Sequence, residues 1–230
     1  MRYPLVALAC LFSVVTAHAV EAQEKLFGKD PVTGLGYLLY QPKTVAKEKL
    51  PLLIFLHGSG ERGADLKLLH KNNLPKRLDA MADLPYIAVA PQCPAGKRWD
   101  DVALLDQFLD HLLATLPVDR DRVVLTGLSL GGFGTWKWGA ARPERFAGLA
   151  PVCGAGDANT VGSLKGMPVW AFHGDKDPAV PYERGKAMAT AAEKAGALVK
   201  FTTYPGVGHN SWVQAYEEPE FDRWVLARHR

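Results

Sequence analysis

Cysteine is scarce in this sequence. Only three cysteines occur among 230 residues, which excludes a framework of disulfide bonds. Cys10 falls in an apolar stretch near the start, while Cys93 and Cys153 lie in the body of the chain. In an oxidising compartment these two could pair, or both could be buried small apolar residues. The sequence favours unpaired thiols.

Motifs that hold metals or nucleotides are also absent. The chain has no H-E-x-x-H, no G-x-x-x-x-G-K-[ST] and no Cys/His spacing typical of zinc. We therefore expect neither a metal nor another cofactor. The 27 Lys and Arg nearly balance the 24 Asp and Glu, for a net charge of +3, and no basic run occurs. This balance predicts no nucleic-acid partner.

Long hydrophobic runs are missing as well. A bilayer-spanning helix needs about 20 consecutive apolar residues. The run Leu5–Val15 is too short to span a membrane. It follows Arg2 and precedes Ala17-His18-Ala19, an A-x-A cleavage pattern. These are the parts of a secretory signal peptide, so we expect residues 1–19 to be removed. The mature protein is then predicted to be secreted or periplasmic, without a stable membrane anchor.

Residues 20–230 are predicted to form a single domain. The chain is 48% hydrophobic and 22% charged, which is ordinary for a globular protein. Short runs that are apolar on both faces alternate with helix-like segments, a pattern that predicts a mostly parallel sheet covered by helices on both faces. We expect strands at 52–56, 86–90, 122–126, 146–152, 169–172 and 199–204, an edge hairpin around 35–40, and helices at 65–81, 101–116, 131–141, 182–195 and 212–229.

Two helix boundaries are predicted from single residues. Asp100 is the expected N-cap of the helix at 101–116, because aspartate accepts hydrogen bonds from the first free N–H groups. Asn72, Asn73 and Pro75 are expected to break the helix at 65–81. In a sheet of this kind ligands bind at the carboxyl ends of the strands, so the residues just after each strand carry the functional prediction.

The first such segment is LIFLHGSGERG, which contains a literal G-x-G-x-x-G at Gly58–Gly63. In a dinucleotide-binding turn, an acid should follow about 20 residues later, near the end of the next strand. Here that strand ends at 90–93, in Ala-Pro-Gln-Cys, with no acid. The sequence therefore predicts that the turn offers its backbone N–H groups to another negative charge.

A second motif, Gly127-Leu128-Ser129-Leu130-Gly131, stands between an expected strand and an expected helix. This G-x-S-x-G in that context is typical of a nucleophile elbow, a turn so tight that both flanking residues are glycine. We expect Ser129 to be the nucleophile. A non-functional glycine-rich turn with an idle serine is the alternative.

A serine hydroxyl needs an oriented base, and in this architecture an acid and then a histidine follow the serine along the chain. His209 lies in a glycine-rich loop after the last expected strand and is the predicted base. Asp175 and Asp177 both follow the strand at 169–172. Asp177 precedes Pro178, whose ring favours an extended residue before it, so Asp177 is the predicted acid. Asp175 would cap local N–H groups of the turn.

With these motifs in this order, the chain resembles an α/β-hydrolase. It is most similar to the secreted bacterial branch described as carboxylesterase, phospholipase/carboxylesterase-like or predicted peptidase. Residues 53–60, 127–132, 173–181 and 208–209 carry the likeness. The resemblance implies a Ser129, Asp177 and His209 triad, with an oxyanion hole formed by the backbone N–H groups of Ser59 and Leu130; Gly60 is the near alternative to Ser59. Only 154–167 separates the fourth and fifth strands, which leaves little or no lid.

The sequence thus predicts a secreted serine carboxylic-ester hydrolase that works through a covalent acyl-enzyme. Short-acyl or aryl esters are the expected substrates, with esters linked to a polysaccharide as one option. Trp99 and Trp212 are expected at the rim, where an aromatic ring could stack on an aryl or sugar group, or could simply cover the core. A serine peptidase and a non-catalytic binding protein on the same scaffold stay open, as does the oligomeric state.

Overall fold

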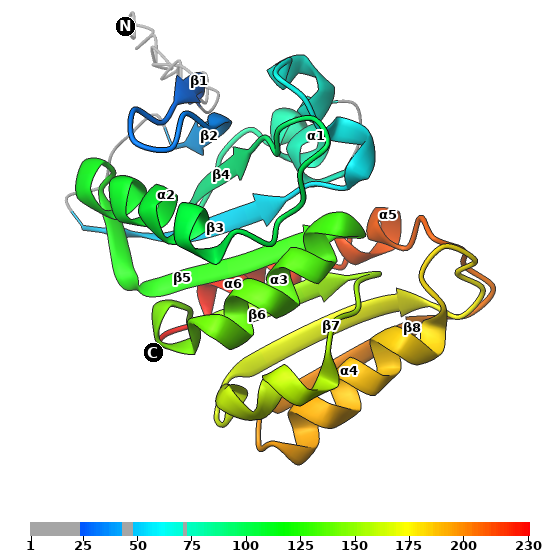
Figure 1. Ribbon diagram of the computed structural model, residues 1–230. Coiled ribbons are helices and arrows are strands. Elements are labelled where there is room, and N and C mark those ends of the chain that lie inside the picture. The colour runs from blue at the N-terminus through cyan, green and yellow to red at the C-terminus, as the bar shows by residue number, and fades with distance from the viewer. Residues whose placement is uncertain (1–23, 43–47, 71–72) are drawn as a thin grey trace, which may run out of the picture.

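The computed structural model describes residues 24–42, 48–70 and 73–230 (Figure 1). The expected signal peptide at 1–19 lies outside the described residues. Within the described ranges, no helix has the length and apolarity that a membrane span requires.

A single eight-stranded sheet forms the centre of the molecule, with the order β1-β2-β4-β3-β5-β6-β7-β8. From β4 to β8 across the sheet, neighbours pair in parallel, while β1 and β2 form an antiparallel hairpin at one edge. The mostly parallel sheet predicted from the sequence is therefore confirmed. An edge hairpin is also present, but the predicted range 35–40 covers only its second strand, because the first strand is β1. The strands are β1 Glu24–Lys29, β2 Gly36–Gln41, β3 Leu50–Leu56, β4 Ile87–Pro91, β5 Val118–Leu128, β6 Gly148–Val152, β7 Pro168–Gly174 and β8 Leu198–Tyr204.

The central strands are apolar on both faces because both faces are covered. Along β3, Leu52, Ile54 and Leu56 point into one core cluster, whereas Leu53 and Phe55 point into the other. Successive side chains of a strand alternate between faces, so a strand buried on both sides reads as a continuous apolar run.

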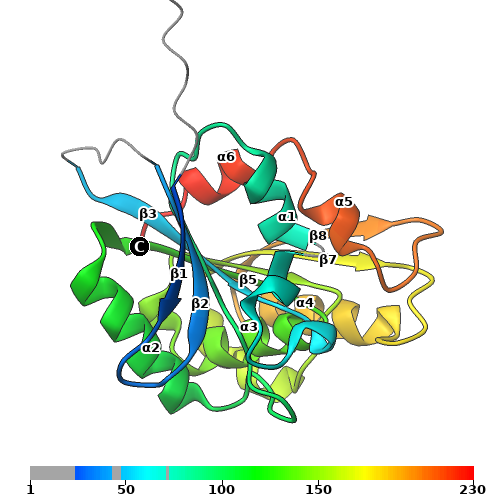
Figure 2. The same ribbon diagram turned by 90° about the horizontal axis from the view of Figure 1, so that it is seen from above.

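Helices form a layer on each face of the sheet, which Figure 2 shows edge-on. Buried residues of α2, α3 and α4 belong to the first core cluster, and those of α1, α5 and α6 lie in or beside the second. The helices are α1 Asn73–Ala80, α2 Val102–Thr115, α3 Leu130–Ala141, α4 Tyr182–Lys194, α5 Trp212–Ala215 and α6 Phe221–Leu226. Short 3₁₀ helices are η1 Ser59–Glu61, η2 Leu66–His70, η3 Pro143–Arg145 and η4 Ala158–Leu164.

The single helix expected at 212–229 is wrong, because the structure forms two short helices, α5 and α6, in its place. Pro219 lies between them. A proline lacks the N–H that would continue the helical hydrogen bonds, and it disfavours helical backbone in the residue before it.

Two predicted helix boundaries also change. The N-cap of α2 is Asp101 and not Asp100, since the Asp101 side chain accepts a hydrogen bond from the Leu104 N–H at 3.0 Å. The segment 65–81 is divided as expected, into η2 and α1, but Asn73 and Pro75 lie inside α1. Pro75 falls in the first turn, where its missing N–H would have no partner within the helix.

The sheet order brings the ends of β3 and β5 together, although β3 is followed in sequence by β4 on its other side. Such a reversal of strand order is where open α/β sheets form their crevice. Helix α3 starts from this point and packs so closely on β3 that a Cβ on Gly131 would lie 1.8 Å from the Leu56 carbonyl oxygen.

We expect Gly131→Ala to lower the free energy of unfolding by at least about 3 kcal/mol, since the clash is with backbone and not with a movable side chain. Urea unfolding followed by circular dichroism measures this change. Gly162→Ala is the matched control, because a Cβ at Gly162 meets nothing within 4 Å. Its effect should stay within about 1 kcal/mol. Equal stabilities of the two variants would contradict the packing described here.

Candidate active site

The turn between β5 and α3 holds Ser129 in an unusual backbone conformation, with φ 51° and ψ −115°. Positive φ is rare for a residue other than glycine and costs on the order of 1–3 kcal/mol, so surrounding structure must hold it. The Ser129 N–H donates to the Val152 carbonyl at 3.0 Å, and the Ser129 carbonyl accepts from the Phe133 N–H at 3.0 Å. These bonds tie the turn to β6 and to the first turn of α3.

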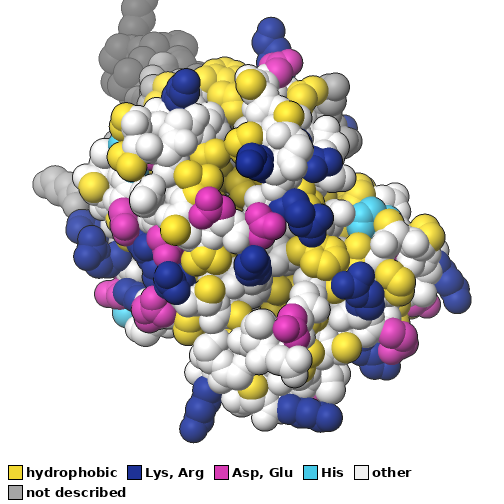
Figure 3. All heavy atoms as spheres, in the orientation of Figure 1, with side chains coloured by type: hydrophobic (Ala, Val, Ile, Leu, Met, Phe, Trp, Pro, Cys, Tyr) yellow, Lys and Arg dark blue, Asp and Glu magenta, His cyan; other side chains and the backbone are white. Residues whose placement is uncertain are grey.

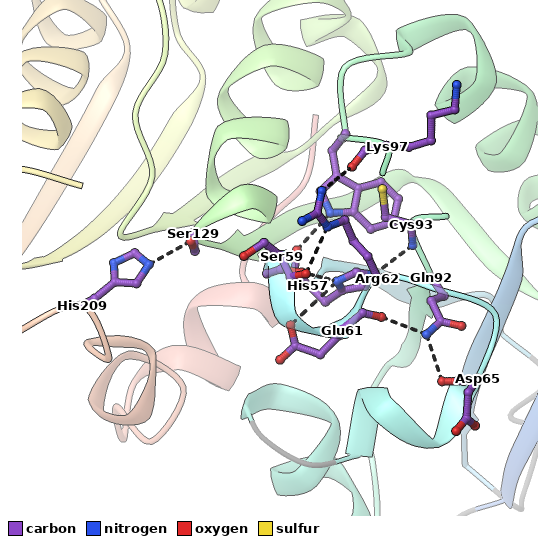
Figure 4. A network of polar contacts seen from close by, with 12 residues as sticks. His57, Ser59, Glu61, Arg62, Asp65, Gln92, Cys93, Lys97, Ser129 and His209 are labelled. Carbon is purple, nitrogen blue, oxygen red and sulfur yellow. Dashed lines mark hydrogen bonds and ion pairs between the residues drawn. The ribbon is translucent and has the colours of Figure 1, made fainter. Parts of the chain in front are cut away.

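Three side chains that the sequence singled out meet at the carboxyl ends of the strands. His209, in the loop after β8, has its Nε2 2.8 Å from the Ser129 Oγ, as Figure 4 shows. The Nδ1 of the same ring lies 2.7 Å from the Asp177 Oδ2. A proton on Nδ1 donates to the carboxylate, which leaves Nε2 free to accept the serine hydroxyl hydrogen. The arrangement is a continuous chain from hydroxyl to carboxylate.

Asp177 is buried and tightly held. Its Oδ1 accepts hydrogen bonds from the backbone N–H groups of Ala179 and Val180, both at 2.9 Å. On the other oxygen, the His173 Nε2 lies 3.3 Å away, and that nitrogen also donates to the Val180 carbonyl at 2.8 Å. With these partners the carboxylate cannot turn away from His209 without breaking several hydrogen bonds.

Asp175, the other candidate for the acid, forms hydrogen bonds with backbone groups instead of with His209. Its Oδ1 accepts from the Gly206 N–H at 2.7 Å, and its own N–H donates to the Tyr204 carbonyl at 3.2 Å. Both bonds connect the loop after β7 with the loop after β8, which carries His209. Asp175 therefore joins the two loops. The expectation that it caps N–H groups of its own turn is wrong, because its carboxylate accepts from Gly206 in the other loop.

The two residues expected to form an oxyanion hole lie in the loop after β3 and at the start of α3. Ser59 begins η1, three residues after the end of β3, and Leu130 is the first residue of α3. The loop lies close to the nucleophile, since a Cβ on Gly58 would be 3.8 Å from the Ser129 Cβ. The use of the Ser59 and Leu130 N–H groups as anion donors stays a prediction.

His57 fixes this loop from within the protein. Its Nδ1–H donates to the Gly58 carbonyl at 2.6 Å, and its Nε2 accepts from the Cys93 N–H at 2.8 Å. The Trp99 indole N–H donates to the His57 carbonyl at 2.9 Å. Burial lowers the pKa of His57 to about 4, so the ring is neutral and one nitrogen can accept. His57 is thus a structural histidine that holds the loop after β3.

Further bonds brace the same loop, and Figure 4 shows them together. The Gln92 side-chain amide donates to the Glu61 carbonyl at 2.8 Å and to the Asp65 carbonyl at 2.9 Å. Arg62 donates to the carbonyls of Ser59 and Lys97. Sequence reasoning missed Gln92; a polar residue at the end of a buried strand was the signal for it.

The two tryptophans expected at the rim have different surroundings. Trp99 is buried, 4% exposed, and its ring packs edge-on against His57 with centroids 5.1 Å apart. Trp212 is half-buried, and its ring packs edge-on against His209 at 5.3 Å. A role in binding substrate stays a prediction for both.

Cys93 and Cys153 are unpaired and buried, which agrees with the expectation of free thiols. Burial raises the pKa of Cys93 to about 11 and that of Cys153 to about 12, so both thiols are protonated at neutral pH. Among the described residues, no group of three or more His, Cys, Asp or Glu is placed to hold a metal ion.

A cavity of about 520 Å³ runs along α3 from Leu130. Phe133 and Met188 lie in its apolar wall, and charged side chains, among them Arg98, stand at its edge. Leu130, which directly follows Ser129, lines this cavity, whereas Ser129, Asp177 and His209 do not. The site can thus activate a hydroxyl at the start of α3, and the cavity offers apolar surface along the same helix.

Comparison with known proteins points to one family. A family model described as Phospholipase/Carboxylesterase matches residues 99–218, more than half of the chain. Acyl-protein thioesterase 1 of Gibberella zeae is 28% identical over 218 residues, covering 76% of this chain and 90% of that protein. A protein of Aspergillus flavus named "Probable feruloyl esterase C" is 28% identical over 142 residues, covering 60% of this chain and 53% of its own length.

Among solved structures, a thermostable esterase is 31% identical, with a TM-score of 0.78. The match covers 92% of this chain and 64% of that one. The chain thus spans less than two thirds of the thermostable esterase and about half of the Aspergillus protein.

The neutral state of His57 makes stability depend on pH. In the unfolded chain a histidine takes up a proton near pH 6.5, whereas folded His57 does so near pH 4. The contribution of this pKa difference to the free energy of unfolding is complete above pH 6.5. It is lost as the pH falls toward 4, because the unfolded state binds the proton first. We expect about 3 kcal/mol of the free energy of unfolding to disappear over this window.

Urea unfolding at a series of pH values measures the effect against His57→Gln. The variant should be less stable at pH 7 and should show a shallower decline between pH 6.5 and 4. Parallel pH curves for the parent and the variant would show that His57 is not the group responsible.

Proposed function

Since the chain belongs to the phospholipase/carboxylesterase family of α/β-hydrolases and is a hydrolase of ester bonds, we propose that Ser129, His209 and Asp177 are its catalytic triad. The observation that carries this proposal is the unbroken chain from the Ser129 hydroxyl through His209 to the buried Asp177 carboxylate. Nucleophile, base and orienting acid stand in the order that a serine hydrolase requires.

In this mechanism the Ser129 Oγ attacks the ester carbonyl while the His209 Nε2 takes up the hydroxyl proton. Asp177 holds the ring in the required tautomer and stabilises its positive charge. The negative carbonyl oxygen is bound by the N–H groups of Ser59 and Leu130, each worth roughly 3 kcal/mol of barrier. His209 then protonates the leaving alcohol, and water that it activates hydrolyses the acyl-enzyme.

We propose short-acyl or aryl esters as the substrates, including esters carried on a polysaccharide. The apolar cavity along α3 supports this, because it has space for a compact acyl or aryl group and is lined by Leu130, the residue after Ser129. The connection between β6 and β7 contains only η4 as regular structure, so nothing comparable to a lid is inserted there. The relative named as a feruloyl esterase supports the aryl option.

We expect Ser129→Ala to abolish hydrolysis of a short p-nitrophenyl ester and Asp177→Asn to lower kcat by about 10⁴, because the amide favours the wrong histidine tautomer. Asp175→Asn is the matched control. Its side-chain oxygen still accepts the Gly206 N–H, so activity should stay within a factor of about three.

Retained turnover in Ser129→Ala would rule out the triad, and a larger loss in Asp175→Asn than in Asp177→Asn would reassign the acid. A panel of p-nitrophenyl, feruloyl and acetyl-sugar esters beside chromogenic peptides tests the substrate class. Peptides that are cleaved faster than every ester would favour a peptidase.

We also propose that residues 1–19 direct export and are then removed, on the basis of the apolar run and the Ala17-His18-Ala19 pattern. Expressed with its leader in a bacterium, the protein should appear outside the cytoplasm with Val20 at its N-terminus. Cell fractionation and N-terminal sequencing check this. An intact Met1 on cytoplasmic protein is the contrary result.

A further inference from the structure

Two arginines from distant segments lie over one aromatic ring beside the nucleophile. The Arg98 guanidinium, in the loop between β4 and α2, is 5.9 Å from the centroid of the Phe133 ring. The Arg184 guanidinium, in the first turn of α4, is 5.6 Å from the same centroid. Phe133 stands one turn of α3 beyond Ser129, since its N–H donates to the Ser129 carbonyl. Two cations therefore converge on one ring in the first turn of the helix that starts at the proposed nucleophile.

Neither guanidinium has a carboxylate partner among the residues that the structure describes. Several other arginines are paired with acids, and these pairs are Arg77 with Asp222, Arg142 with Asp106, Arg145 with Asp106 and Asp110, Arg223 with Glu220, and Arg230 with Asp121. Lack of an acid partner is not peculiar to these two, since Arg228 also lies over a ring, that of Trp224, without an ion pair to an acid of the described chain. Arg98 and Arg184 are distinguished because both are exposed and both guanidinium groups lie over the same ring.

The position of Arg184 is also unfavourable by itself. The N-terminal turn of a helix carries a partial positive charge, so a cation there loses about 0.3–1 kcal/mol relative to a neutral residue. Arg184 nonetheless occupies this turn of α4, and its guanidinium is directed over Phe133. A ligand of negative charge would remove both the repulsion from the helix and that between the two arginines.

Acidic side chains nearby do not cancel this charge. Asp157 lines the same cavity, but its carboxylate accepts the Asn159 N–H and caps η4. Asp100 and Glu183 are sequence neighbours of the two arginines, and neither forms an ion pair with them in the part of the chain described. Figure 3 shows basic and acidic side chains interspersed with hydrophobic atoms over the face that α3 and α4 present.

We propose that this enzyme prefers esters that carry an anionic group, such as a carboxylate, held by Arg98 and Arg184 beside Phe133. Guanidinium groups bind carboxylates with paired hydrogen bonds, and the ring supports the apolar stem that joins the anion to the ester. The cavity wall at Leu130 and Phe133 holds that stem. The inference rests on the proposed function, since it places the anion relative to an ester at Ser129.

Two matched pairs of substrates test the preference. On the alcohol side, 4-acetoxybenzoate is compared with its neutral methyl ester. On the acyl side, the p-nitrophenyl monoester of adipic acid is compared with its methyl-capped form. In the parent protein the charged member of at least one pair should have the higher kcat/KM, and added salt should reduce the difference.

Arg98→Gln and Arg184→Gln should each lower the charged-to-neutral ratio of kcat/KM by up to about fivefold, as expected for exposed ion pairs. The double variant should lower it by more than about tenfold. Rates for the neutral esters should stay within about twofold of the parent, because no group of the triad is touched. Arg184→Lys should retain part of the preference. Arg223→Gln, an exposed arginine on α6, is the control and should change nothing.

An unchanged ratio in the double variant, for both substrate pairs, would overturn the anion site. So would a parent protein that favours the neutral member of both pairs. Failure of the proposed function has a different result: the parent would hydrolyse none of the esters, or Ser129→Ala would hydrolyse them at the parent rate.

Discussion

The left-handed turn at Ser129 is the constraint on which the rest of the site depends. A residue with a side chain avoids this conformation, so the protein must supply the opposing energy through contacts. The Val152 carbonyl on one side and the first turn of α3 on the other provide them. The glycines around the serine then follow from geometry, because Gly131 has to lie where only a hydrogen fits against β3.

Two kinds of polar network surround that turn. His209 and Asp177 form a chain that can move a proton, with His209 partly open to solvent and Asp177 fixed by backbone N–H groups. His57 and Gln92 form a network in which neutral groups link one loop to another. The network of His209 and Asp177 can change its charge during a reaction. The network of His57 and Gln92 holds backbone N–H groups in place and stays neutral. A preorganised site needs both properties.

The parts of the site that were predictable from the sequence are those specified by local chemistry. Ser129 is marked by its flanking glycines, and Asp177 by the proline after it. The two arginines that lie over the Phe133 ring could not be predicted in this way, because Arg98 and Arg184 come from segments far apart in sequence. The central strands of the sheet were predictable because each contains a short apolar run. The N-cap of α2 was not, because it depends on which of two adjacent aspartates, Asp100 or Asp101, reaches a free N–H group.

The placement of the three residues of the proposed triad after three separate strands also bears on how the protein folds. Ser129, Asp177 and His209 follow β5, β7 and β8, which belong to the parallel part of the sheet, where β6 pairs with β5 and β7, and β7 pairs with β8. Such long-range pairing makes a high contact order, and the last pairing to form completes the constellation. A folding intermediate without β8 in place would have the proposed nucleophile but lack the proposed base. Recovered activity after dilution from denaturant would therefore count only molecules whose sheet is complete, whereas helical signal would return earlier.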